Sequence, residues 1–229
     1  MKHSNTRQMN LLNKWLLVFL LTALPAAGRL YAQHYVSDAK IVYKLELPPE
    51  QLQMDAMLEG STLTQYMRGH LSRIDMNLNV VHYTYLINSK EQSLVTLIDN
   101  HVDKYLIRSG KEEYEKELKQ YAGTQFKDET GTKELVGHTC KRAIGTTPDG
   151  KTFEVYYAPD LIPENKHYNR RFVNLKGIPL QFEIITRTGA KMMVTATSLD
   201  LHPVPSSMFE VPVSGYKVIS KEELQRMGN

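Results

Sequence analysis

Cysteine is almost absent from this chain of 229 residues, because Cys140 is the only one. A single cysteine excludes an intrachain disulfide, so the stability of the fold must come from its core. Cys140 lies in a run of residues typical of a strand, which favours a small buried side chain over a nucleophile. A nucleophile would also need a base beside it, and spacing along the sequence places none there.

Long apolar runs are lacking after residue 24. Residues 1–32 combine basic residues, an apolar run from Trp15 to Leu24 and the helix-breaking Pro25–Gly28, which is the pattern of a secretory signal peptide. We expect cleavage after Ala32, with no lipid-modified N-terminus because no cysteine lies near the cut. Since the apolar run is short for a bilayer, we expect a soluble periplasmic protein with peripheral or transient membrane contact at most; the alternative is a retained N-terminal anchor.

An excess of positive charge is also missing once residues 1–32 are set aside. They hold four of the 28 basic residues and none of the 25 acidic ones, which leaves 24 basic residues against 25 acidic. Nucleic-acid binding through a basic patch therefore has little support. The remaining residues, 33–229, suit one domain with a sizeable core.

Motifs that carry chemistry are absent as well. The histidines of residues 33–229 are scattered singly, without the spacing of a zinc motif. The acidic run Asp99–Asp103 is more simply a polar turn between two strands than a set of metal ligands. No nucleophile elbow, phosphate loop or dinucleotide fingerprint occurs. We therefore predict no cofactor, no metal and no catalytic residue.

What the chain does have is alternation of apolar and polar residues. Leu180, Phe182 and Ile184 share one face of a predicted strand, with Gln181 and Glu183 on the other. Similar strands are predicted at Asp38–Leu47, Thr62–Asn77, Val80–Ile87, Leu94–Asp99, Lys104–Arg108, Gly137–Thr146, Thr152–Ala158 and Lys191–Leu199. Short helices are predicted at Glu50–Leu58, at Glu112–Tyr121 and after Ser220, while residues 123–132 and 160–171 are predicted to be irregular.

These elements predict an α+β, mainly β fold of about 9–11 strands. The short polar connections favour an antiparallel meander. So many strands in one sheet must curl, and the few short helices are expected on the concave side. The eight methionines of residues 33–229, among them Met67, Met76, Met192 and Met193 on strands, can line an adaptable cavity or fill a core. A strongly curved sheet favours the cavity.

Several segments of the second half carry a family resemblance. They are Gly137–Lys141, Thr147–Gly150, Val155–Leu161, Leu175–Leu180, Phe209–Pro212 and Gly215–Lys217. In these segments the chain resembles an uncharacterised family of secreted bacterial proteins with a domain of unknown function, which is similar to the periplasmic lipoprotein-sorting carriers of the LolA/LolB-like group. The Lys-Gly-Ile-Pro-Leu run is also similar to an envelope family with a Gly-Leu-Pro-Gly-Leu-Ile motif.

The resemblance implies an unclosed antiparallel β-barrel wrapped over helices. In the sorting carriers its apolar cavity receives lipoprotein acyl chains. The chain departs from that group because it lacks an N-terminal lipidated cysteine and because Ser220–Asn229 does not match the carriers' C-terminal extension. Arg68 and Arg73 are the candidates for the arginine that couples cavity to lid in that group.

We therefore predict a non-enzymatic periplasmic protein that shelters an apolar ligand, such as a lipid or the acyl chains of a lipoprotein. The predicted lining is Tyr43, Leu45, Met67, Tyr83, Tyr85, Leu180, Phe182, Met192 and Val194. One alternative is an envelope protein–protein interaction module with a filled core, which docks a partner at a sheet edge or at residues 160–171. A hydrolase is the other alternative, and it needs a polar constellation in a cleft.

Overall fold

The computed structural model describes residues 33–47, 60–185 and 191–227, all of them within the unit Gln33–Asn229. The predicted helix Glu50–Leu58 lies outside the described residues. Within the described ranges, no helix is long and apolar enough to cross a membrane.

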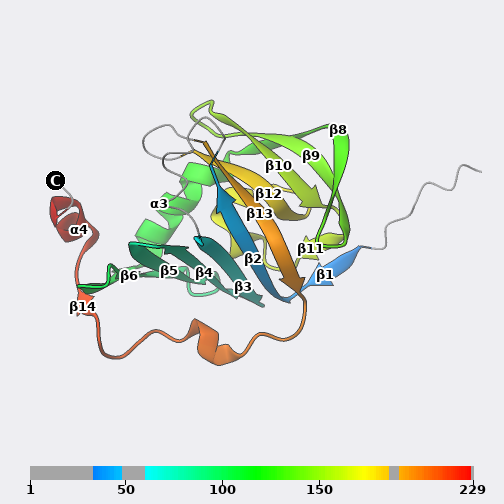
Figure 1. The fold of residues 1–229 in the computed structure, drawn as a ribbon. Helices are drawn as coiled ribbons and strands as arrows, with labels where there is room; N and C mark the ends of the chain where they lie inside the picture. Colours follow the sequence, from blue (N-terminus) through cyan, green and yellow to red (C-terminus); the bar gives the residue numbers. More distant parts are fainter. Residues whose placement is uncertain (1–32, 48–59, 186–190, 228–229) are drawn as a thin grey trace, which may run out of the picture. The chain divides into compact units, whose positions relative to one another are not determined.

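Twelve strands form one curved, unclosed sheet (Figure 1). Along the sheet they are ordered β14-β7-β6-β5-β4-β3-β2-β13-β12-β10-β9-β8, and every neighbouring pair is antiparallel except β14 and β7. The strands are β2 (Asp38–Glu46), β3 (Thr62–Arg68), β4 (Leu71–Leu78), β5 (Val81–Asn88), β6 (Ser93–Asp99), β7 (Lys104–Ser109), β8 (Gln125–Leu135), β9 (His138–Thr146), β10 (Thr152–Ala158), β12 (Ile178–Ile185), β13 (Lys191–Asp200) and β14 (Lys217–Val218). Two more strands, β1 (His34–Val36) and β11 (Leu161–Pro163), form a separate parallel pair. The predicted fold class, a mainly β half-barrel, is confirmed, with more strands than predicted.

Helices occupy few of the described residues. They are α3 (Lys111–Ala122), α4 (Lys221–Met227) and three 3-10 turns, η2 (Lys166–Tyr168), η3 (Arg170–Phe172) and η4 (Ser206–Phe209). Tyr114 and Leu118, one turn apart on α3, pack against Ile87 and Leu94 of the sheet, as the apolar stripe of this helix predicts. The helix predicted after Ser220 is α4, and it begins with a capping box: the Ser220 hydroxyl accepts from the Glu223 amide and the Glu223 carboxylate accepts from the Ser220 amide.

Two stretches of the sheet differ from the sequence prediction. The segment Thr62–Asn77, predicted as one extended run, is the β3–β4 hairpin, with Gly69 at φ +52° in its turn. Residues 123–132, predicted to be irregular, belong largely to β8, which pairs with β9 across a bulge between Asp128 and Thr132. Because β8 is an edge strand with most of its side chains exposed on both faces, it has no apolar alternation for a pattern to detect.

The largest core fills the concave side over β2, β3, β9, β10, β12 and β13. Side chains from residues 166–175, a stretch that overlaps the predicted irregular segment 160–171, complete it. Tyr168, Phe172 and Leu175 are buried there, and the Phe172 ring packs edge-on against Phe182 at 4.9 Å between centroids. This part of the half-barrel therefore has a solid interior.

The chain after β13 runs along the outside of the sheet, where it is drawn in orange in Figure 1. Arg68 Nη1 donates to the Val204 carbonyl at 2.5 Å, and Arg73 Nη1 donates to the Met208 carbonyl at 2.9 Å. Further on, Val211 and Tyr216 pack on a cluster of buried side chains from β5, β6 and β7. Arg68 and Arg73, the candidates for coupling a cavity to a lid, therefore hold the C-terminal segment against the sheet.

Gly177 is needed for a close approach between two backbone segments. A β-carbon at this position would lie 2.1 Å from the Ala158 carbonyl oxygen and 2.8 Å from the Tyr157 ring. The Ala158 backbone cannot move aside as the end of a flexible side chain could. The entry to β12 beside β10 therefore requires a residue without a side chain.

We expect Gly177→Ala to lower the free energy of unfolding by about 2–3 kcal/mol, because the added methyl group overpacks this contact. Urea unfolding followed by circular dichroism measures the change. Gly110→Ala is the matched control, since nothing lies within 4 Å of a β-carbon there; as a change at a helix N-cap it should cost at most about 1 kcal/mol. Equal losses in the two variants would contradict the close approach.

Candidate functional site

A groove of about 920 Å³ lies over β5, β6 and β7 and is bordered by residues of α3 and α4. Its floor is built by alternate residues of the three strands, which point to one face of the sheet. The side chains that form most of this floor are Tyr83, Tyr85, Leu94, Thr96, Ile98 and Ile107. The volume is in the range of small-molecule sites, which are mostly apolar with a few polar groups.

The strand register sets the floor of the groove. Tyr83 lies opposite Ile98, and Tyr85 lies opposite Thr96. The two tyrosine rings are stacked, with centroids 6.4 Å apart and planes 9° from parallel. Burial, followed by the nearby Tyr83, raises the pKa of the Tyr85 hydroxyl, so this side chain is uncharged at neutral pH. The floor therefore offers flat aromatic and aliphatic surface without charge.

The rim of the groove is charged and joins three elements. One carboxylate oxygen of Glu117 on α3 forms an ion pair with Arg170 of η3. The other carboxylate oxygen lies 3.1 Å from Lys221 Nζ of α4. Leu224 of α4 packs with the cluster of Ile98, Tyr105, Ile107 and Ile219. A partly exposed ion pair such as Glu117–Lys221 contributes about 0–1 kcal/mol. The short helix α4 is therefore held at the groove by weak contacts.

The structure separates the nine side chains predicted to line a ligand cavity. Seven of them are buried in the large core, each with at most 7% of its surface exposed: Tyr43, Leu45, Met67, Leu180, Phe182, Met192 and Val194. Only Tyr83 and Tyr85 line the groove. The seven core residues pack against one another and against Tyr168, Phe172 and Leu175, so their part in ligand binding stays a prediction.

Sequence reasoning missed most of the groove. Leu94, Thr96 and Ile98 alternate along β6, and this pattern was a signal that pointed to the same face as Tyr83 and Tyr85. No such signal exists for Glu117 and Lys221, because they come from two helices far apart in the chain.

Cys140 has the features of a structural cysteine. Its side chain is fully buried, and its Sγ atom contacts the backbone carbonyl of His138 at 3.6 Å. Burial, with smaller effects from Asp160 and Glu134, raises the pKa of the thiol to about 12. The His138 ring is paired instead with the Asp160 carboxylate at 2.7 Å. This arrangement does not activate the thiol.

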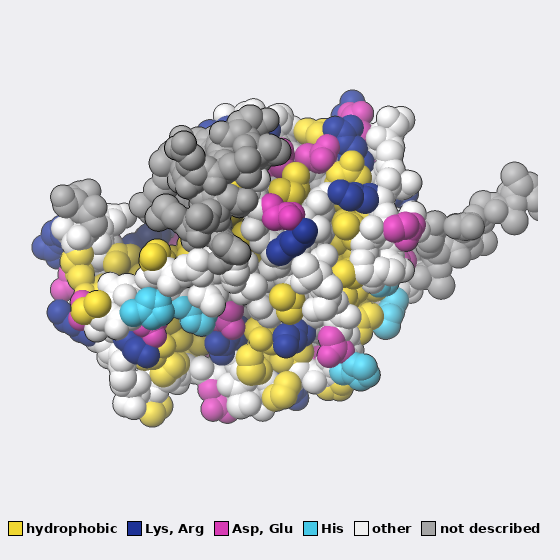
Figure 2. Space-filling model, viewed as in Figure 1, with side chains coloured by type: hydrophobic (Ala, Val, Ile, Leu, Met, Phe, Trp, Pro, Cys, Tyr) yellow, Lys and Arg dark blue, Asp and Glu magenta, His cyan; other side chains and the backbone are white. Residues whose placement is uncertain are grey.

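Charged side chains of both signs are interspersed over the face of the molecule drawn in Figure 2. Among residues 33–47, 60–185 and 191–227, no three histidine, cysteine, aspartate or glutamate side chains gather as a metal site. The groove thus combines an uncharged floor with a charged rim.

Comparison with known proteins gives only distant likenesses. No family model and no curated protein matches the chain. Among solved structures, PNGF-II has a TM-score of 0.49 at 15% identity, over 83% of this chain and 33% of its own, so this chain spans about a third of its length. An uncharacterised conserved protein from Thermus thermophilus has a TM-score of 0.49 at 10% identity, over 81% of this chain and 91% of its own. MucB, also solved in complex with MucA, has a TM-score of 0.39 at 12% identity, over 77% of this chain and 58% of its own. With every one of these TM-scores below 0.5, nothing about activity or partners is carried over from them.

We expect Phe182→Ala to lower the free energy of unfolding by about 3–5 kcal/mol, because it opens a cavity in a filled core between Tyr43 and Phe172. Urea unfolding measures the loss. Tyr35→Ala removes an aromatic ring that is 64% exposed and should change stability by about 0.5 kcal/mol or less. A small loss for Phe182→Ala would indicate a loosely packed interior that has room for a ligand.

We expect Cys140 to resist Ellman's reagent at pH 8 in the folded protein, because its raised pKa leaves almost no thiolate and burial blocks access. One thiol per chain should react after unfolding in guanidinium chloride. A Thr197→Cys variant, with the new thiol at an exposed position on β13, is the positive control for rapid labelling. Fast reaction of Cys140 in the folded wild-type protein would support a role for this cysteine as a nucleophile.

Proposed function

We propose that this chain is an exported, non-catalytic binding protein with a half-barrel of the lipoprotein-carrier type, and that its groove over β5–β7 takes an apolar or amphipathic ligand such as an acyl chain. The observation that supports it most is the pairing of an uncharged floor, with Tyr83 and Tyr85 stacked, and a charged rim at Glu117 and Lys221. An acyl chain would lie on the floor, and a polar head group would remain at the rim.

Desolvation supplies the binding free energy in this proposal. Each methylene group removed from water contributes about 0.8 kcal/mol, which is about a fourfold gain in affinity. No covalent step is involved, and the thiol of Cys140 has no part in it.

The proposal includes export to the periplasm directed by residues 1–32, in keeping with the charge and apolar pattern of that segment.

Docking of a partner protein is the second candidate function. Filling of the large core by Tyr168, Phe172 and Leu175 favours it, because these side chains occupy space that a ligand in the half-barrel would need. In that case the groove would receive an apolar helix face from the partner instead of a lipid. Native mass spectrometry of the protein purified from the periplasm, with extraction of lipids, separates the two candidates: a bound lipid supports the first and a bound protein supports the second.

We expect Thr96→Phe to weaken binding of the neutral dye N-phenyl-1-naphthylamine at least tenfold, because the added ring fills the floor of the groove. Dye fluorescence measures the affinity, and competition with decanol and dodecanol should show about a tenfold or greater gain for the longer alcohol. The matched control is Thr64→Phe on β3, whose position in the strand alternates with the buried Leu63, Gln65 and Met67 and so lies on the opposite face.

Wild-type binding in the Thr64→Phe variant and a loss in Thr96→Phe support the groove. Equal affinities in the two variants would place the dye elsewhere, and absence of saturable binding in the wild type would remove the ligand proposal. Unchanged urea midpoints confirm that both variants remain folded.

A further inference from the structure

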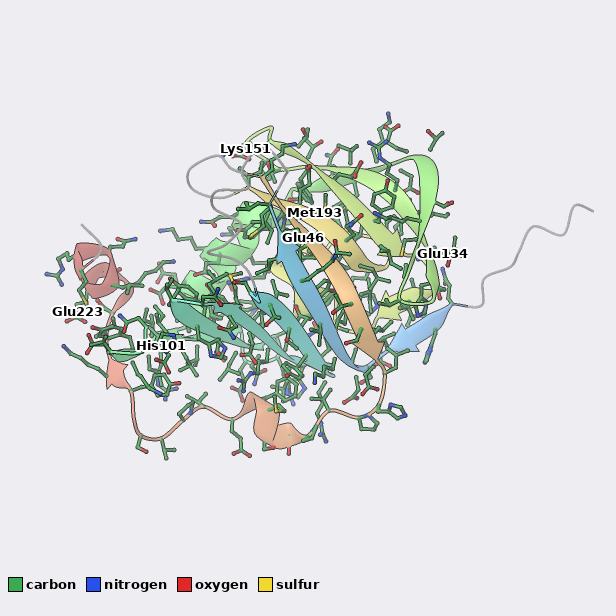
Figure 3. The ribbon with its side chains drawn as sticks, in the orientation of Figure 1. Glu46, His101, Glu134, Lys151, Met193 and Glu223 are labelled. Carbon is green, nitrogen blue, oxygen red and sulfur yellow. The ribbon has the colours of Figure 1, made fainter. Side chains whose placement is uncertain are left out.

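A second pocket, of about 580 Å³, shares no lining residue with the groove. It lies where the C-terminal end of α3 meets the β9–β10 turn and the end of β12, near Lys151 in Figure 3. One side is apolar and is formed by Phe153, Ile184 and Ile185. Arg171 of η3 also lines this pocket, and its surroundings are unusual for a charged side chain.

The guanidinium of Arg171 is enclosed by aromatic rings. It stacks over Phe153 at 4.0 Å from the ring centroid, with Phe172 at 5.8 Å and Phe182 at 5.9 Å. Its Nη2 atom donates to the backbone carbonyl of Glu183 at 2.6 Å. Stacking on aromatic faces is a property of arginine in particular, since its planar cation is weakly hydrated.

This cation has no carboxylate within ion-pair distance among the described residues. The carboxylate of Glu183, the residue whose backbone accepts from Arg171, is engaged elsewhere: it accepts from the Glu154 amide at 3.0 Å and lies 3.4 Å from Lys191 Nζ. Burial lowers the pKa of Arg171 to about 10, against smaller opposing effects of Tyr121 and Glu183. A guanidinium carries five donor hydrogens, and one backbone carbonyl and three ring faces use only part of that capacity.

The other charges around this pocket already have partners. Lys151 Nζ lies 2.8 Å from the Asp149 carboxylate, and Thr147 donates to the same carboxylate at 2.5 Å. These two hydrogen bonds lower the pKa of Asp149 to about 2. Arg171 is thus the one cation lining this pocket, among the residues described, that lacks an anionic partner.

A purely structural role accounts for part of this geometry. Stacking of Arg171 on Phe153 fastens η3 to β10, and the hydrogen bond to Glu183 fastens it to β12. A neutral side chain of similar length would fill the same space without the cost of a desolvated charge, but it would lose the cation–π attraction and the hydrogen bond to Glu183. These contacts leave donor hydrogens of the guanidinium without an acceptor beside an apolar wall, which suits a ligand that has both an anion and an alkyl chain.

We propose that this pocket binds an amphipathic anion, a carboxylate or phosphate that carries an alkyl chain, with the anion paired to the Arg171 guanidinium and the chain lying against Phe153, Ile184 and Ile185. A guanidinium matches such anions through two parallel hydrogen bonds. Because the pocket and the groove share no residue, this site does not depend on ligand binding in the groove.

Calorimetric titration of the Thr96→Phe protein, in which the groove is blocked, tests the site. Dodecanoate and dodecanol are the probes, both below the concentrations at which they aggregate, at pH 8. Dodecanoate should bind at least tenfold more tightly than dodecanol. Added Arg171→Met should reduce this preference to less than twofold, whereas added Arg108→Met, which removes the same charge from an exposed position on β7, should leave it unchanged.

Equal binding of the two probes to the Thr96→Phe protein would overturn the proposal, and so would a preference that survives Arg171→Met. If Arg171→Met does not fold, carbon-13 NMR of carboxyl-labelled dodecanoate on the Thr96→Phe protein gives the answer. A carboxyl pKa lowered by at least one unit on binding supports pairing with the guanidinium, and an unchanged or raised pKa contradicts it.

Discussion

The contact between Phe172 and Phe182 divides the concave face of the sheet into two regions. On one side of it, residues 166–175 bring Tyr168, Phe172 and Leu175 against the inner residues of β2, β10, β12 and β13, and the interior is filled. Over β5–β7, α3 and α4 border the face, and among the described residues the groove lies there. A curved sheet presents more inner surface than its own side chains cover, so the placement of one loop decides where space is left.

Consecutive residues of η3 serve the two regions. Arg170 pairs with Glu117 at the rim of the groove, and Arg171 is inserted among Phe153, Phe172 and Phe182. Because both arginines belong to one 3-10 turn fixed by the burial of Phe172, a shift of this turn would displace the rim of the groove and the guanidinium of the second pocket together. The two candidate sites therefore have separate linings on a shared support.

Alternation in the sequence was enough to predict the strands that bury one face, such as β2 and β10, and the apolar stripe of α3. It failed for β8, where most side chains on both faces are exposed and only Phe126 and Leu135 reach the core. It also failed for residues 166–175, because Tyr168 and Phe172 stand among polar neighbours without a period. Of the site, Tyr83 and Tyr85 were predictable from one strand, whereas the link of Glu117 to Arg170 and Lys221 depends on tertiary structure.

The parallel pairing of β14 with β7 has a consequence for the order in which the chain acquires its structure. The N–H and C=O groups on the outer side of β7 gain their partners from Lys217 and Val218, and the Ile219 amide adds a bond to Leu106. These residues lie more than a hundred positions after β7 in the sequence, so the ribosome makes them well after β7. Until they have emerged, a chain with β5, β6 and β7 already paired presents an open strand to its neighbours, and so β7 is protected against intermolecular strand addition only after this delay.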